Sequence, residues 1–70
     1  MYELEKTRLY FDIGGNTVFT TIKESNNFNE LLELSKTVKL RSGKTFMEKL
    51  VINEIIDSDI IDVFIIEETV

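Results

Sequence analysis

The carboxylates in the last quarter of the chain are the residues whose types and spacing come nearest to a chemical site. They are Glu54, Asp57, Asp59, Asp62, Glu67 and Glu68. A calcium loop of the EF-hand type needs oxygen ligands at alternating positions and a glycine at the sixth. Counted from Asp57, the fifth position is Ile61 and the sixth is Asp62. The spacing therefore excludes that calcium loop, and we expect no bound metal and no cofactor.

The side chains that most often carry catalysis are missing from the sequence. The chain contains neither cysteine nor histidine, so it has no thiolate and lacks the commonest general base near neutral pH. Paired carboxylates can act as acid and base, but a domain of 70 residues has little room for a pocket around them. We therefore expect no catalytic residues and no enzymatic activity.

Two glycine patterns resemble parts of nucleotide-binding loops. Ser42-Gly43-Lys44-Thr45 matches the end of a Walker A loop, but the glycine required five residues before Gly43 is replaced by Val38. Gly14-Gly15 lacks the third spaced glycine and the following helix of a dinucleotide site. Neither pattern predicts nucleotide binding.

The charge of the chain restricts its partners. The chain has 13 acidic and 8 basic residues and a net charge of −5, which opposes binding to nucleic-acid phosphates and to anionic membranes. A nucleic-acid interface would require Lys36, Lys39, Arg41, Lys44 and Lys49 to gather on one face. With no apolar stretch long enough to span a bilayer and no secretory signal at the N-terminus, we expect a cytoplasmic protein.

The stretch Thr45–Glu68 must supply the core, because it has the highest density of apolar and β-branched residues. In its first half, Thr45-x-x-Glu48 matches a helix capping box. However, on a helical wheel the apolar residues of this half scatter around most of the circumference. Val51, Ile52, Ile55 and Ile56 are β-branched and suit a pleated surface. We therefore predict a strand over Thr45–Ile56.

The second half of this stretch is predicted to return antiparallel to the first. Asp57-Ser58-Asp59 is typical of a turn, and Ile60–Glu68 is predicted to be a strand. One of its faces carries Ile60, Asp62, Phe64 and Ile66, and the other carries Ile61, Val63 and Ile65. Because both faces are apolar over the middle, the pattern is typical of a strand inside a sheet.

The rest of the chain supplies the elements that complete the fold. We predict strands over Tyr2–Ile13, Thr17–Lys23 and Thr37–Arg41, turns at Gly14–Asn16 and Ser42–Lys44, and a helix over Phe28–Lys36 capped by Asn26 or Asn27. The expected fold is a single α+β domain over residues 1–70, with a small, mostly antiparallel sheet, one helix packed on it and the order ββ-α-βββ.

Part of the predicted sheet is similar to a known motif. Val38–Phe46, followed by Leu50 and Val51, resembles the first half of an Sm-like motif, in which a short helix precedes a strand, a glycine turn and a long bent strand. That family usually has a second glycine near the bend, where this chain has Glu48 and Lys49. We therefore assign neither the family nor its functional residues.

The size of the chain points to association with another protein. A single helix can cover one face of the sheet, which leaves Ile61, Val63 and Ile65 on the other. Keeping three such side chains in water forgoes about 1.5–3 kcal/mol each, a large loss for a small domain. We therefore expect a small non-enzymatic protein–protein interaction or oligomerisation module that forms a homodimer through these residues.

A second functional hypothesis starts from the acidic residues. An acidic inhibitor or decoy would occupy a basic surface on a partner protein. The contact residues would be Asp57, Asp59, Asp62, Glu67 and Glu68.

Overall fold

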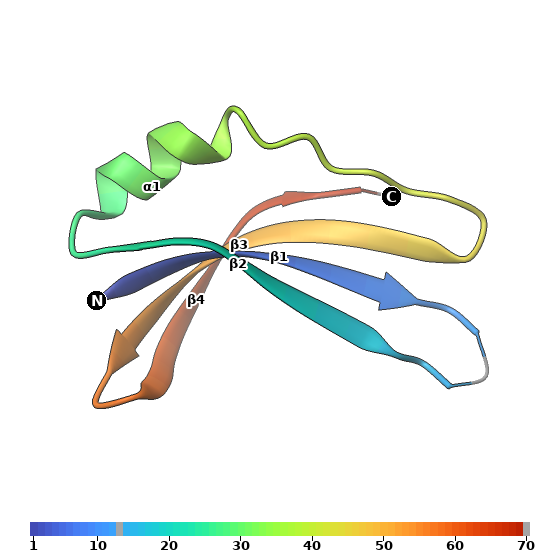
Figure 1. Cartoon of the computed structure of the whole chain (residues 1–70), viewed down its shortest axis with the longest axis horizontal. Helices are drawn as coiled ribbons and strands as arrows, with labels where there is room; N and C mark the ends of the chain where they lie inside the picture. Colours follow the sequence, from blue (N-terminus) through green and yellow to red (C-terminus); the bar gives the residue numbers. More distant parts are fainter. Residues whose placement is uncertain (13, 70) are drawn as a thin grey trace.

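Two antiparallel hairpins pair with each other to form one sheet, and a helix lies along one side of it (Figure 1). The structure, a computed structural model, describes residues 1–12 and 14–69. Within them the elements are β1 (Tyr2–Tyr10), β2 (Thr17–Ser25), α1 (Phe28–Ser35), β3 (Phe46–Ile56) and β4 (Asp59–Glu68). The strand order is β2-β1-β3-β4, and all three neighbouring pairs are antiparallel. The predicted α+β class is confirmed, with one strand fewer than expected.

The helix begins at the predicted residue. The Asn27 side chain accepts hydrogen bonds from the backbone N–H groups of Asn29 (3.0 Å) and Glu30 (3.3 Å), which is the arrangement of an N-cap. Glu30 does not return the bond to Asn27, because its carboxylate binds Lys23 at 2.8 Å and Ser25 at 2.9 Å. These contacts join the first turn of α1 to the end of β2.

The strand predicted over Thr37–Arg41 is wrong. Residues 36–45, here called the arm, run without regular structure from α1 to β3. The alternation of Val38 and Leu40 reflects contact with the core on the helix side of the sheet rather than strand pairing. No pairing position is left for the arm on β3, because β1 and β4 occupy its two edges.

The strand predicted over Thr45–Ile56 is confirmed as β3, but the position predicted for the following strand is wrong. β3 lies inside the sheet, and β4 lies at its edge. The two hairpins join through β1 and β3, which leaves the second strand of each hairpin outside. The apolar residues on both faces of β4 therefore do not indicate burial.

The core lies between the sheet and α1. Leu4, Leu50 and Ile52 from the sheet and Leu31 from the helix are fully buried. At one end of this core the Phe28 ring meets the rings of Tyr2 and Phe64 edge to face, with centroids 5.3 Å and 5.2 Å apart. The helix thus covers one face of the sheet.

The turn predicted at Asp57-Ser58-Asp59 is confirmed and tighter than expected. Asp57 and Ser58 connect β3 to β4 with φ angles of 51° and 69°, the geometry of a two-residue hairpin. In the first hairpin Gly15 supplies a positive φ of 56°. Strand β1 ends at Tyr10, and the predicted strand end at Ile13 falls outside the described residues.

Candidate functional site

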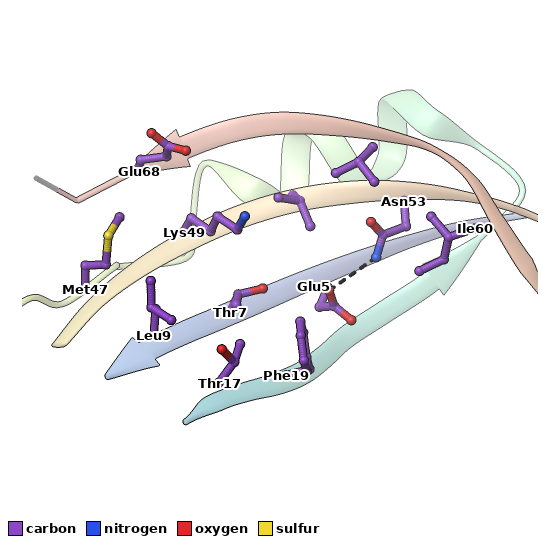
Figure 2. A pocket seen from close by; sticks show the side chains of 12 residues that line it. Glu5, Thr7, Leu9, Thr17, Phe19, Met47, Lys49, Asn53, Ile60 and Glu68 are labelled. Carbon is purple, nitrogen blue, oxygen red and sulfur yellow. Dashed lines mark hydrogen bonds between the residues drawn. The ribbon is translucent and has the colours of Figure 1, made fainter. Parts of the chain in front are cut away.

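The side of the sheet facing away from α1 is hollowed. The hollow has a volume of about 510 Å³, and in Figure 2 the helix lies behind the sheet, away from the side chains drawn. All four strands contribute to its lining. The lining residues are Glu5, Thr7, Leu9, Thr17, Phe19, Met47, Lys49, Val51, Asn53, Ile60, Val63 and Glu68. We refer to this side of the sheet as the open face.

Strand alternation explains which residues reach the open face. Successive side chains of a strand point to opposite sides of the sheet. Leu4 of β1 and Leu50 and Ile52 of β3 pack against the helix. Their odd-numbered neighbours in β1 and β3 therefore point to the open face, and the register places Glu5 opposite Val51 and Thr7 opposite Lys49.

The residues at the centre of the open face, here called its floor, are buried, whereas the apolar residues at its margin, here called its rim, are exposed. Val51 and Asn53 are each only 2% exposed, although both line the hollow. At the rim, Phe19 is 65% exposed and Val63 49% exposed. Large apolar side chains gathered beside a few polar groups are typical of a binding surface.

Asn53 organises the polar part of the floor. Its side-chain N–H₂ group donates to Glu3 at 3.1 Å and to Glu5 at 3.3 Å, and Figure 2 shows the bond to Glu5. Burial and the neighbouring charge of Glu3 raise the pKa of Glu5, against the opposing effects of the Asn53 hydrogen bond and of Lys49. A carboxylate in this position favours contact with a donor or a cation.

The three residues predicted to mediate self-association are all exposed. Val63 lines the hollow, and Ile65 lies opposite Val51, which shares that side. A register shift between Glu54 and Ile55 breaks the alternation of β4. Because of this shift, Ile60 lines the hollow together with Val63, although the sequence placed them on opposite faces.

The acidic residues predicted as a contact site are spread along β4 instead of gathering. Asp57 lies in the turn, and Asp59 follows it opposite Ile56. At the other end of the strand, Glu67 lies opposite Leu50 and Glu68 opposite Lys49, whereas Asp62 lies between the two ends. A strand advances about 3.3 Å per residue, so the two acidic ends are about 25–30 Å apart.

The basic residues do not meet on one surface either. Lys49 lines the open face. Lys36, Lys39, Arg41 and Lys44 belong to the arm, which packs on the helix side through Val38 and Leu40. The condition that the sequence set for a nucleic-acid interface is therefore not met.

The sequence did not predict the roles of Asn53, Glu5 and Phe19 at the open face. A signal for them exists in the alternation of β1 and β3, since the neighbours of buried Leu4 and Ile52 must face the other way. That alternation could be used only once β1 and β3 were known to be adjacent.

Within the described ranges, no group of three or more His, Cys, Asp or Glu side chains is arranged to hold a metal ion. The one helix found there is too short and too polar to cross a membrane. Comparison of the chain with protein-family models, with curated proteins and with solved structures gives no match.

Proposed function

We propose that this protein is a small non-enzymatic protein–protein interaction module and that it forms a homodimer through its open face. The observation that carries the proposal is the contrast between the two sides of the sheet. α1 and the arm cover one side, whereas the other side presents exposed Phe19, Val63 and Ile65 around the hollow. Burial of these side chains supplies the driving force for association.

A second copy of the chain offers a partner surface of the same extent as the open face, because in a two-fold dimer both copies use the same surface. All four strands of each copy line this surface. A stable interface of standard size buries about 800 Å² on each partner. Face-to-face packing of two such sheets, about 10 Å apart, would form a two-layer sandwich.

The charges of the open face are compatible with a two-fold interface. In such an interface contacts are reciprocal, so that a residue that meets a second residue of the other copy is matched by the same contact in reverse. Lys49, Glu5 and Glu68 all line the hollow. A two-fold arrangement can therefore place Lys49 of one copy beside a carboxylate of the other.

The substitution Val63→Glu tests the homodimer. A charge buried in the interface without a partner is strongly unfavourable, so we expect the variant to be monomeric where the native protein is dimeric. Mass is measured by size-exclusion chromatography with light scattering. Val18→Glu is the matched control, because Val18 is 50% exposed and lies in β2 beside Lys6 and Arg8, away from the open face.

The control variant should keep the native mass. A native protein that is monomeric at high micromolar concentration, with a melting temperature independent of concentration, would contradict the homodimer. If Val63→Glu and Val18→Glu both leave a dimer intact, that dimer uses another surface.

A further inference from the structure

The outer edge of β4 offers an unpaired strand to a partner. Met1 and Ile55 exchange both backbone hydrogen bonds, at 3.1 Å and 2.7 Å. Because bonded and non-bonded pairs alternate along an antiparallel ladder, the odd-numbered residues of β3 bond to β1 and the even-numbered ones to β4. The bond from the Thr69 N–H group to the Glu48 carbonyl, 2.9 Å long, agrees with this alternation.

The same alternation shows which β4 backbone groups point away from the sheet. Val63 lies opposite Asn53, and Ile65 lies opposite Val51. Asn53 and Val51 are odd-numbered, so their backbone groups bond to β1 and not to β4. The N–H and C=O groups of Val63 and Ile65 therefore have no partner on β3 and point to the outer edge. In agreement, the Val63 N–H group donates to the Asp62 side chain at 2.9 Å instead of to β3.

The side chains of β4 define the kind of strand that this edge can accept. Apart from Asp62, the residues between Asp59 and Glu67 are all apolar, and most are β-branched. Acidic residues lie at both ends, with Asp57 and Asp59 at one end and Glu67 and Glu68 at the other. An exposed, apolar edge of this kind is a template for strand pairing.

A second copy of β4 is poorly suited to this edge. Antiparallel pairing of two β4 strands about their middle would place Asp59 of each copy near Glu67 of the other. Like charges directly opposite one another destabilise a strand pair. The two acidic ends instead complement a strand with a cation at each end.

We propose that the outer edge of β4 docks an extended segment of another protein, with a β-branched apolar middle and Lys or Arg at both ends. The segment adds a strand to the sheet, a known mode of peptide recognition. Its backbone bonds to Val63 and Ile65, and the Asp62 carboxylate, which occupies the Val63 N–H group in the free chain, turns away. This site goes beyond the proposed homodimer, because it uses the edge of the sheet instead of its open face.

Synthetic peptides test the charge preference of the edge. The probe is a fluorescent peptide of about nine residues, the length of a long strand, with alternating Val and Thr in the middle and two Lys at each end. The control peptide has the same middle and two Glu at each end. We expect binding of the first peptide, measured by anisotropy, to be at least tenfold tighter and to weaken as salt is added. Equal affinities would overturn the proposal.

The substitution Val63→Pro tests the backbone contact. Proline removes the outward N–H group but no bond of the β3–β4 ladder, and edge strands tolerate it for that reason. We expect about tenfold weaker binding of the Lys-ended peptide. Val63→Thr keeps both the N–H group and the β-branched shape, and it should bind within about twofold of the native protein. Native affinity in Val63→Pro would overturn the proposal.

A modified peptide covers the case in which Val63→Pro fails to fold. Two further peptides are N-methylated at alternate residues, one at the odd positions and the other at the even positions, so that each has one of its two hydrogen-bonding edges blocked. We expect one of these peptides to lose binding and the other to keep it. Loss of binding by both peptides, or retention by both, would overturn the proposal. The N-methylated peptides leave the chain itself unaltered, so their result does not depend on the homodimer, which is tested separately by the mass of the native protein and of Val63→Glu.

Discussion

Glu48 is a fully buried carboxylate on the covered side of the sheet. It accepts hydrogen bonds from the Arg8 guanidinium at 2.9 Å and from the Arg41 N–H group at 2.7 Å, and Lys6 lies 3.6 Å away. The Arg8 guanidinium also lies over the Phe46 ring, 4.3 Å from its centroid. The Glu48 carboxylate of β3 therefore forms hydrogen bonds with both β1 and the arm.

The substitution Glu48→Gln should destabilise the fold. The glutamine keeps an acceptor oxygen but loses the charge that Arg8 and Lys6 face. These two side chains are 28% and 31% exposed, so we expect a loss of stability smaller than that of a fully buried ion pair but larger than that of an exposed one. The free energy of unfolding in urea measures the change. Glu33→Gln is the control, since Glu33 forms an exposed ion pair with Lys36 at 3.1 Å, and such pairs contribute little. Equal, small effects of both substitutions would show that the Glu48 charge is not needed.

The pH dependence of stability should show two glutamates acting in opposite directions. Burial acts to raise the pKa of Glu48, but the bonds from Arg41 and Arg8 and the charge of Lys6 outweigh burial, so its pKa lies below the ordinary value. Glu48 therefore stabilises the fold above the ordinary glutamate pKa, and this contribution is lost as the pH falls through its lowered pKa. The pKa of Glu5 is raised in the folded protein. As the pH falls from this raised pKa towards the ordinary glutamate pKa, Glu5 becomes protonated in the folded protein before it does in the unfolded chain, and this stabilises the fold.

The substitution Glu5→Gln isolates the second effect. Its amide oxygen can still accept the bond from Asn53, but it never carries the charge that burial disfavours. We expect the variant to be more stable than the native protein at neutral pH, with the difference shrinking as Glu5 protonates in acid. Urea unfolding across the acidic range measures this difference, and a constant difference would contradict the raised pKa.

At the scale of elements, the turn between β3 and β4 carries backbone strain. Asp57 and Ser58 both have positive φ angles. Asp tolerates this conformation better than most residues, whereas the second position of such a turn is usually glycine. We expect Ser58→Gly to raise the free energy of unfolding by about 1 kcal/mol, measured by urea unfolding. A loss of stability would show that the Ser58 side chain makes a contact that outweighs the strain.

At the scale of the whole molecule, one sheet and one short helix make a thin domain. The accessible surface is 4873 Å², somewhat above the roughly 4,500 Å² that the scaling law predicts for a monomer of 8.2 kDa. The difference agrees with a sheet that is covered on one side only. Both proposed interactions follow from this architecture, one at the open face and the other at the edge of β4.

Local patterns in the sequence were sufficient to predict most elements. The β-branched residues of Thr45–Ile56 outweighed the capping box at Thr45, and the structure shows why, because the Glu48 carboxylate binds Arg8 and Arg41 instead of capping a helix. The helix cap was narrowed to Asn26 or Asn27, and Asn27 forms it through N–H groups only two and three residues away. Interactions of this range depend on neighbouring residues, which the sequence shows directly.

Two features of the sheet depend on its long-range pairing, namely which strand lies inside it and which residues share a face. Apolar alternation in Thr37–Arg41 and in Ile60–Glu68 predicted a fifth strand and an interior strand. The pairing of β1 with β3 instead left the arm without a partner strand and placed β4 at the edge. That pairing joins residues about 40 to 50 positions apart, such as Leu4 and Ile52. Local patterns were enough to predict the strands that form the sheet, the turn between β3 and β4 and the start of the helix, because these depend on short-range forces. The open face and the free edge depend on contacts between distant segments, which local patterns do not specify.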